Sequence, residues 1–422
     1  MTRVIIAGAG IAGLVTALTL RQIGVACTIY EAAPEMPRRG VGLNLQPNAV
    51  RELYDLGIAG GHLNSVGLPL REWAMVGLNG KDIHSELRGI QAGFHWPQFS
   101  VDRGLFHMML YRTVLQRLGA HSVVLGARIV GYRQNRDHVV ALFEDGREER
   151  GAVLAAADGI HSTVRAQMHP DQPPINRGRG MLWRGLTRAQ PIRTGSSVIA
   201  MGTRTKRFVL FPISHPSRDG LAMHCWIAHL MQADHGSDHA QEWFVPAQTE
   251  HFAHHFDNFC DDWIDIPSLI RNSEQVFETP ILDRDPIPTW RDGRVVLLGD
   301  AAHPMFPIGA NCTSQAIVDA RVLGASIVEH GLTDYALDAY DDKLCTPVAT
   351  LVEANRTEGP FELISIVDAR CGGSFDDIEE VCPKSERAYY LARFNAITGF
   401  AADLLNTTPP IIAPGARAAI AS

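Results

Sequence analysis

Apolar and polar positions in the first thirty residues predict a strand, a helix and a second strand. Residues 3–8 are a short apolar run, residues 12–24 carry apolar side chains three and four positions apart, and residues 26–31 return to a strand pattern. Two strands separated by one helix are the unit from which parallel sheets are built. We therefore expect an α/β fold at the start of the chain.

The patterns further along predict a second, separate sheet. Helical periodicity recurs in residues 47–57 and 103–119, whereas short alternating runs predict strands within residues 70–76, 81–87, 127–159 and 179–230. We expect residues 239–271 to form helices that cap the second sheet.

The buried-strand character of the beginning returns at residues 294–298, and a long amphipathic helix is predicted for residues 313–331. The first domain is therefore expected to be discontinuous, with a β-sheet domain inserted into it. The resulting boundaries are 1–70, 101–178 and 272–355 for the first domain, 71–100 and 179–271 for the inserted domain, and 356–422 for a C-terminal helical segment.

Composition and charge narrow the functional classes. The chain has 422 residues, 46% hydrophobic and 20% charged, with a formal net charge of -8, which argues against nucleic acid as the main partner because such binding needs clustered Lys and Arg. Its seven cysteines are scattered without a C-x-x-C pair, which suits a reducing cytoplasm, and no apolar stretch is long enough to span a membrane. We expect a cytoplasmic monomer or homodimer.

The turn after the first strand is a Rossmann-type dinucleotide-binding turn, G-x-G-x-x-G, formed by Gly8, Gly10 and Gly13. Gly8 allows the tight bend, Gly10 lets a pyrophosphate approach the backbone at the helix N-terminus, and Gly13 permits close packing of helix on sheet. Glu31 ends the second strand at the spacing expected for an acid that binds ribose hydroxyls, and its charge disfavours a 2′-phosphate. The turn alone does not choose between FAD and NAD.

Asp300 follows the apolar run of residues 294–298, and a helix is expected to begin near Thr313 or Ser314. Ligands of open α/β sheets bind at the carboxyl ends of the strands, so this carboxylate is placed to accept hydrogen bonds from a sugar chain. The uncapped N–H groups of the helix would stabilise a negatively charged ligand.

Three motifs together resemble those of the class A, single-component FAD-dependent aromatic hydroxylases, which have the p-hydroxybenzoate hydroxylase-like fold. They are GAGIAG with Glu31, ADGIHSTVR at 157–165 and LLGDAAHPMFPIGAN at 297–311. The segments PQFSVDRGLF, WRG at 183–185 and DRDPIPTW at 283–290 make the chain most similar to phenazine-1-carboxylate-type hydroxylases. The resemblance reaches from residue 3 to about 356.

The resemblance implies bound FAD, NADH or NADPH as a transient co-substrate, and O2. It assigns Arg103 to the pyrophosphate and ribityl region of FAD, and Asp158 and Arg165 to flavin support and to the pyridine nucleotide. The expected cofactor-binding residues are Gly8, Gly10, Ala12, Gly13, Glu31, Ala32, Val41, Arg103, Leu125, Asp158, Asp300, Gly309, Ala310 and Asn311.

In such enzymes NAD(P)H reduces FAD, O2 adds at flavin C4a, and the hydroperoxide transfers one oxygen to an aromatic or heteroaromatic ring, with or without a carboxylate and with or without loss of CO2. The cofactor carries the chemistry, and the sequence assigns no catalytic acid or base. The expected substrate pocket is apolar and consists of Trp183, Met201, Phe211, Met223, Trp226, Pro304, Phe306 and Pro307.

Other functions stay open at this point. A flavoprotein dehydrogenase, an epoxidase or a non-catalytic flavin-bearing protein would use the same motifs, whereas an NAD-linked dehydrogenase is disfavoured by the Asp300 loop. A zinc site at His251, His254 and His255 is disfavoured because no H-E-x-x-H motif is present, and we expect no metal. Cys312 stands where relatives carry a small residue, and we expect it to fill space rather than to react.

Overall fold

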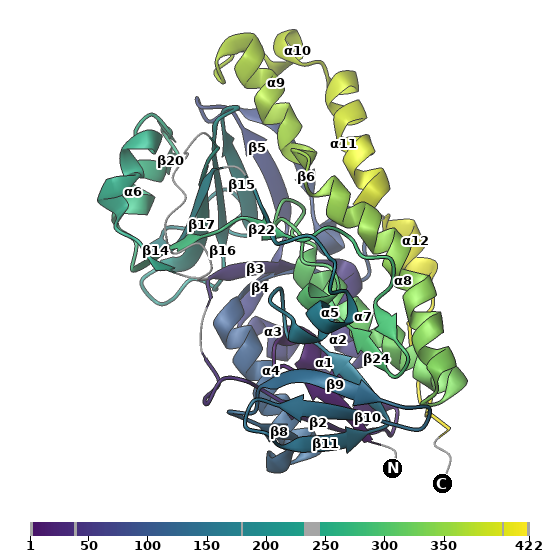
Figure 1. Cartoon of the computed structure of the whole chain (residues 1–422). Helices are drawn as coiled ribbons and strands as arrows, with labels where there is room; N and C mark the ends of the chain where they lie inside the picture. The colour runs from purple at the N-terminus through teal and green to yellow at the C-terminus, as the bar shows by residue number, and fades with distance from the viewer. Residues whose placement is uncertain (1–2, 38–39, 179, 232–244, 399–400, 420–422) are drawn as a thin grey trace.

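The computed structural model describes residues 3–37, 40–178, 180–231, 245–398 and 401–419. Figure 1 shows two sheets: a parallel sheet with its helices near the two chain ends, and a larger twisted sheet beyond it. No helix within the described part is long and apolar enough to cross a bilayer.

The first sheet has six strands in the order β23-β24-β12-β1-β2-β8. β1 pairs in parallel with β2 and β12, so the predicted β-α-β unit at the N-terminus is confirmed. β12 continues in parallel to β24, and β23 is the single antiparallel edge. The strands span Arg3–Ala7 (β1), Ala26–Tyr30 (β2), Val123–Val124 (β8), Val153–Ala156 (β12), Arg291–Asp292 (β23) and Val295–Leu297 (β24).

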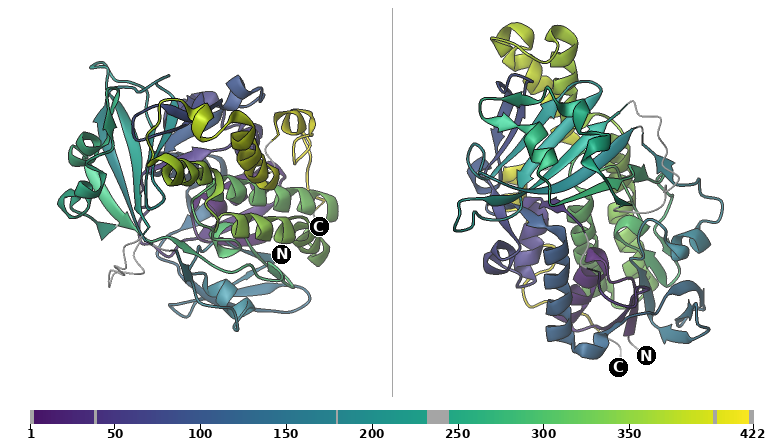
Figure 2. Two further views of the ribbon diagram at one scale, coloured as in Figure 1. Left: turned by 90° about the horizontal axis from the view of Figure 1, so that it is seen from above. Right: turned by 90° about the vertical axis from the view of Figure 1, so that its left-hand side faces the viewer.

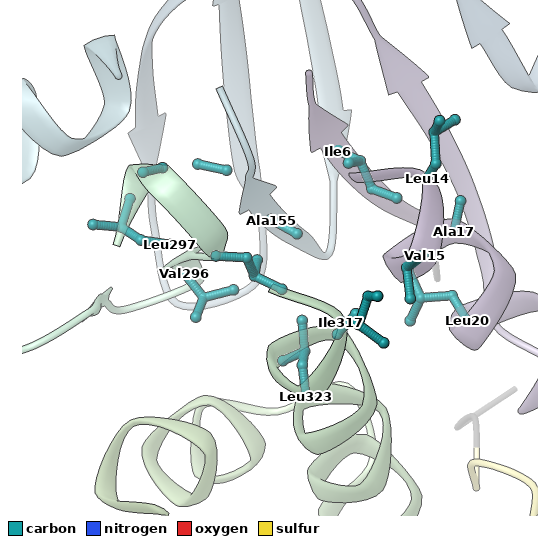
Figure 3. Packing of buried hydrophobic residues seen from close by; sticks show 14 of the residues in the cluster. Ile6, Leu14, Val15, Ala17, Leu20, Ala155, Val296, Leu297, Ile317 and Leu323 are labelled. Carbon is teal, nitrogen blue, oxygen red and sulfur yellow. The ribbon is translucent and has the colours of Figure 1, made fainter. Parts of the chain in front are cut away.

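Helices cover one face of this sheet and bury its main core. Figure 3 shows Leu14 and Val15 of α1 and Ile317 of α7 in one buried cluster with Ile6 and Val296 of the strands. Burying such side chains contributes roughly 1.5–3 kcal/mol each, so this layer fixes the strand ends that carry the motifs. The helices of this part are α1 (Ile11–Gln22), α2 (Pro47–Asp55), α3 (Gly60–Asn64), α4 (Arg103–Leu118), α5 (Thr163–Met168), α7 (Cys312–His330) and α8 (Asp334–Ala354).

The predicted run of strands in residues 127–159 forms an antiparallel meander beside the parallel sheet. Its strands are β9 (Ile129–Gln134), β10 (Val139–Phe143) and β11 (Glu148–Gly151). Phe143 meets Tyr30 of β2 edge to face, with ring centroids 4.9 Å apart. The meander thereby returns the chain to β12 and the second motif.

The second sheet has eight strands in the order β18-β21-β14-β17-β16-β15-β5-β6. Its long central pairs are antiparallel, and the expected pairing of residues 70–76 with 81–87 appears as β5 with β6. β21 joins this sheet beside β14, although the boundary at residue 272 placed it in the first domain. The strands span Glu72–Val76 (β5), Asp82–Leu87 (β6), Met181–Ala189 (β14), Ser197–Gly202 (β15), Lys206–Pro212 (β16), Ala222–Leu230 (β17), Val245–Pro246 (β18) and Gln275–Thr279 (β21).

Each face of the eight-stranded sheet is apolar and covered. One face packs against Phe252, Phe256 and Phe259, and the other against the C-terminal helix α9 (Glu362–Cys371) and Val41. The left view in Figure 2 shows the helical layer along one side of the sheet and the short elements of residues 249–271 on the other. A strand in this sheet therefore alternates between two buried environments.

The segment 239–271 was expected to be helical, and this prediction is wrong for most of the described part. Residues 245–271 form two 3-10 turns, η3 (Thr249–His251) and η4 (Ala253–Phe256), the strand pair β19 (Cys260–Asp261) with β20 (Ile264–Asp265), and a short α6 (Ile266–Arg271). The aromatic rings of this segment anchor irregular turns on the sheet. Residues 239–244 lie outside the described residues.

Two short ribbons connect the sheets, and the tail bridges them. The ribbons are β13 (Asn176–Arg177) with β22 (Leu282–Asp283), and β3 (Gly42–Leu45) and β4 (Gly67–Leu70) on either side of β7 (Gln98–Asp102). Beyond α9, the tail contains α10 (Ile378–Val381), α11 (Lys384–Thr398) and α12 (Ala402–Thr407). Arg51 Nη1 donates to the carbonyls of Leu405 and Thr408, which ties the tail back to the first domain.

Candidate cofactor and substrate site

The three sequence motifs converge at the carboxyl ends of β1, β12 and β24. A Cβ on Gly8 (φ +95°) would lie 2.5 Å from the carbonyl oxygen of Ala157, so the first motif touches the second. A Cβ on Gly299 (φ +58°) would lie 2.9 Å from Cβ of Ala12, so the third motif touches the helix start of the first. Only glycine allows either approach without a backbone shift.

Gly10 and Gly13 have different physical roles. A Cβ on Gly13 would lie 2.0 Å from the carbonyl oxygen of Gly8, whereas a Cβ on Gly10 would meet no atom within 4 Å. Gly10 is also the N-cap of α1, and no side chain caps this helix. The first-turn N–H groups of α1 and the open space at Gly10 together suit a pyrophosphate.

Glu31 lies directly beside this turn. Its Oε2 accepts a hydrogen bond from the N–H of Ala9 (2.7 Å), and its Oε1 accepts one from the N–H of Ala33 (2.8 Å). Each carboxylate oxygen has lone pairs left for ribose hydroxyls. The backbone of Glu31 pairs with that of Val124 and Ala127, so Ala32 and Leu125 lie on two adjacent loops at this end of the site.

Asp300 follows β24 in the 3-10 turn η5 (Gly299–Ala301), as expected for the carboxyl edge of the sheet. Its side chain is exposed to solvent, yet the protein around it desolvates the carboxylate and raises its pKa, while the charges of His303 and Arg103 oppose this rise. A polar ligand that binds here would cover the accessible surface of the Asp300 carboxylate. Arg103, the first residue of α4, is half-buried and feels the charge of Asp300.

Val41 does not present its side chain to this site. The side chain is fully buried in the core beneath the eight-stranded sheet, and the carbonyl of Val41 accepts the N–H of Arg103 at 2.9 Å. Its place is therefore in packing, and it helps to orient Arg103.

The second motif positions the third. Arg165 is 1% exposed, and its Nη1 donates to the carbonyls of Ala301 (3.2 Å) and Ala302 (2.7 Å). Its Nη2 donates to the carbonyl of Asp285 and its Nε to Gln172. Because all three nitrogens donate to protein acceptors, Arg165 holds the Asp300 loop.

The third motif ends just before α7 with an unusual backbone conformation at Ala310. Ala310 has φ +53°, in the left-handed region that a residue with a Cβ rarely adopts, and such strain concentrates at functional sites. Asn311 is the N-cap, but its side chain makes no capping hydrogen bond. The first-turn N–H groups of α7 therefore remain available to an anion, as expected from the sequence.

A buried ion pair supports this loop from behind. His303 Nε2 donates to Asp319 Oδ2 (2.6 Å), and the same oxygen accepts the N–H of Gly299 (2.9 Å). Desolvation lowers the pKa of His303, but the carboxylate of Asp319 more than offsets this, so the pKa is raised. The pair fixes the start of η5 at Gly299 and the chain just after it at His303.

Several buried polar atoms around the motifs have no hydrogen-bond partner in the described part of the chain. They are Asp158 Oδ1, Asn44 Oδ1 and both side-chain polar atoms of Asn311. Buried polar groups are nearly always paired, so this group of atoms indicates a missing polar ligand. With the open space at Gly10 and the accessible Asp300, the residues present fit FAD.

The expected substrate pocket divides between the two faces of the eight-stranded sheet. Trp183, Met201 and Trp226 belong to the core under residues 252–270, and Trp183 stacks on Phe252 at 4.3 Å. Phe211 and Met223 lie on the opposite face, with Val41 and α9. The two groups cannot line one pocket, because successive strand residues point to opposite faces.

The loop residues of the expected pocket are closer to the motifs. Pro304 is buried, and Phe306 and Pro307 are half-buried in the segment between η5 and α7. A Cβ on Gly178 would lie 3.2 Å from the ring of Phe306, so this ring contacts the β13–β22 ribbon between the two sheets.

Two residues at the site were not assigned from the sequence. His107 Nε2 donates to the carbonyl of Ala9 (2.7 Å), which braces the glycine turn from α4. Arg184, on β14, is within electrostatic range of Arg103 and Cys312. The WRG segment carried the resemblance, but the only signal in it for Arg184 was a charge within the otherwise apolar residues 181–186.

Cys312, the first residue of α7, is a protected thiol. Its Sγ donates to the carbonyl of Met305 (3.5 Å), and desolvation raises its pKa to about 12. A thiol with such a pKa is neutral and unreactive at physiological pH, in agreement with a filling role. Within the described residues, no three His, Cys, Asp or Glu side chains are close enough to hold a metal ion.

Comparison with known proteins places this geometry in a family. Residues 1–356 match the family described as FAD binding domain. The chain is 36% identical to phenazine 1,6-dicarboxylic acid hydroxylase of Lysobacter antibioticus over 86% of its length and 91% of that protein. It is 34% identical to aurachin C monooxygenase/isomerase of Stigmatella aurantiaca, over 76% of its length and 79% of that protein.

The fold is also that of a solved flavoprotein. The structure of HpxO from Klebsiella pneumoniae, complexed with FAD and uric acid, superposes with a TM-score of 0.73 at 24% identity, covering 97% of each chain. Fold, motifs and family match agree over the same residues. The chain therefore belongs to the FAD binding domain family and is a flavin-dependent monooxygenase of the aromatic hydroxylase type, with FAD as its cofactor and NAD(P)H and O2 as the family's typical co-substrates.

Proposed function

We propose that the substrate is a flat heteroaromatic ring that carries a carboxylate, and that the enzyme adds one oxygen atom to this ring. The observation that carries the proposal is the 36% identity to phenazine 1,6-dicarboxylic acid hydroxylase over nearly the whole of both chains. An apolar sheet face with few polar groups suits a flat ring, because it offers dispersion contacts and excludes water.

FAD, when bound, supplies the electron transfer and oxygen chemistry, and the protein supplies position and electrostatics. Gly10 and the N-terminus of α1 would bind the pyrophosphate, Glu31 the adenosine ribose, and Asp300 the hydroxyls of the ribityl chain. The N–H groups at the start of α7 would stabilise negative charge on the reduced cofactor, since fixed dipoles cost no reorganisation during the reaction. Arg165 acts through the loop that it holds.

The half-buried apolar side chains Val209 and Ile227 would form the substrate side of the site. Their contribution is to hold the ring and to exclude water, which protects oxygen transfer from wasteful side reactions.

The experiment is a substrate screen on the purified, yellow holoenzyme. Oxidation of NADH and of NADPH is followed with a panel of phenazine carboxylic acids, quinoline carboxylic acids and benzoic acids. The molecular masses of the products are measured by mass spectrometry. We expect stimulated oxidation and a product with one added oxygen, with or without lost CO2, for at least one fused-ring acid. Oxygenation of neutral rings alone would reject the acid substrate class.

A further inference from the structure

A single charged residue interrupts an apolar row that crosses the eight-stranded sheet. Arg184 of β14 is paired with Ile227 on one side and with Phe277 on the other. The row continues from Ile227 through Val209, Ala200 and Met75, all of which lie on the sheet face that packs toward the first domain. Of these six residues, Arg184 alone carries a charge.

The guanidinium of Arg184 has no hydrogen bond or ion pair within the described residues, and its Nε is buried without a partner. Desolvation is the main influence on its pKa, which is lowered. The groups that act on it electrostatically are Arg103, a like charge, and the thiols of Cys225 and Cys312. A desolvated cation without a counter-ion is costly unless a ligand supplies the missing charge.

Arg184 is half-buried, and three fully buried arginines show how a guanidinium is satisfied in this protein. Arg165 donates to three backbone carbonyls, Arg207 is paired with Glu358, and Arg321 is paired with Glu52 and Asp55. Each of them supports the fold through these partners. Arg184 departs from this pattern, so a purely structural role does not account for it.

The location of Arg184 connects the sheet to the cofactor motifs. Cys225, which influences its pKa, lies one row along the same face, where a Cβ on Gly42 would touch the side chains of Cys225 and Phe211. Cys312, its other neutral neighbour, follows Asn311 at the start of α7. The guanidinium thus lies between the apolar row and the loop that ends the third motif.

We propose that Arg184 binds the carboxylate of the substrate and selects acidic over neutral rings. This inference rests on the proposed function and assigns the residue that reads the acid group. The planar fork of donors in arginine matches two carboxylate oxygens, and the flanking Ile227 and Phe277 offer apolar surface to the attached ring. Asp300 does not compete for Arg184, since the cation that feels its charge is Arg103.

The test compares Arg184→Gln and Arg184→Lys with wild-type holoenzyme. Arg188→Gln is the matched control, because Arg188 is four residues along the same strand and forms an exposed ion pair with Asp219. The probes are phenazine-1-carboxylate and phenazine-1-carboxamide, which differ in charge but hardly in shape. Dissociation constants are measured from the change in flavin absorbance, and FAD content is measured for every variant.

In wild type, the carboxylate should bind at least tenfold more tightly than the amide. Arg184→Gln should weaken the carboxylate roughly 10- to 100-fold, as expected for a lost charge-assisted bond, and the amide less than threefold. Arg184→Lys should lie between, and Arg188→Gln should match wild type. FAD content should be unchanged in all of them.

Four outcomes would overturn the inference. Equal weakening of acid and amide would show a packing role, and loss of FAD from Arg184→Gln would show a cofactor role. If wild type hydroxylates aromatic acids and Arg184→Gln binds them unchanged, Arg184 is not the anchor although the proposed function stands. If wild type prefers the amide, both the inference and the acid substrate class fall together.

Discussion

Arg165 Nη1 donates to the carbonyl oxygen of Ala302 at 2.7 Å, so the second sequence motif holds the backbone of the third. The motif arginine thus acts through the main chain of the Asp300 loop. A buried cation can thereby act on the Asp300 loop through the main chain alone.

Replacement of Arg165 by Lys should disturb the Asp300 loop. One ammonium group cannot reach the carbonyls of Ala301, Ala302 and Asp285 together, and unpaired buried carbonyls are costly. We expect the free energy of unfolding to fall by about 2–3 kcal/mol and the FAD dissociation constant to rise about tenfold, by urea denaturation and fluorescence titration. Arg133→Gln, at an exposed ion pair with Glu148, is the control. A destabilised variant that still binds FAD as wild type does would refute the positioning role.

The two glycines of the first turn should respond differently to substitution. Gly10→Val adds a side chain into open space, so the apoprotein should keep its thermal midpoint but lose its yellow colour, because the added methyl groups occupy the pyrophosphate position. Gly13→Ala forces a contact with the Gly8 carbonyl and should lower the thermal midpoint itself. Calorimetry and the absorbance ratio of flavin to protein separate the two effects. Full FAD content in Gly10→Val would contradict this assignment.

Neighbouring residues of β17 should separate stability from substrate binding. Trp226 Nε1 donates to Thr187 and Ser273 on the far face, so Trp226→Phe should cost about 1–2 kcal/mol of stability and leave KM unchanged. Ile227→Phe replaces an aliphatic side chain in the row of Arg184 by a bulkier aromatic one. This change should raise KM several-fold. Steady-state kinetics and denaturation of the two variants check this. A raised KM for Trp226→Phe would contradict this and would indicate that Trp226 lines the substrate pocket.

The His303–Asp319 pair predicts a pH dependence of stability. The folded-state pKa of His303 is raised, so its stabilisation is complete below the ordinary histidine pKa of about 6.5 and is lost as pH rises through the folded-state value. The free energy of unfolding of wild type should therefore fall relative to His303→Gln as pH rises from about 6.5. Urea denaturation at a series of pH values measures the difference, with the exposed His215→Gln as control. A constant difference across that range would mean that His303 does not change its charge.

The sequence predicted those structural elements whose formation depends on residues close together in the chain. The first β-α-β unit, the helix after Asp102 and the strand that delivers Asp300 follow from periodicity and turn residues, and the structure confirms them. Cofactor roles for Gly10 and Asp300 could be proposed from the sequence because such roles depend on position within one motif.

The features that the sequence did not predict depend on distant partners. Trp183 and Phe211 look alike as apolar strand residues, but both faces of their sheet are covered, so alternation could not show which face met the site. The irregular fold of residues 249–265 depends on where Phe252 and Phe256 are buried. The importance of Arg184 follows from its apolar neighbours across the sheet and from its lack of a hydrogen-bond partner among the described residues. Both features depend on the fold and cannot be derived from the sequence.

The tail that ties the two sheets together also brings the chain back to its starting point. The N–H of Ala418 donates to the carbonyl of Ile23, and Ile412 is buried in the core of the parallel sheet. Ala26, which follows Ile23 closely in the chain, pairs with Arg3 of the first strand. The first and last segments that the structure describes are thus neighbours on one side of the molecule, as Figure 1 shows. A short peptide linker could join them, and new termini opened at the exposed turn Glu144-Asp145-Gly146 would yield a circular permutant with every strand intact.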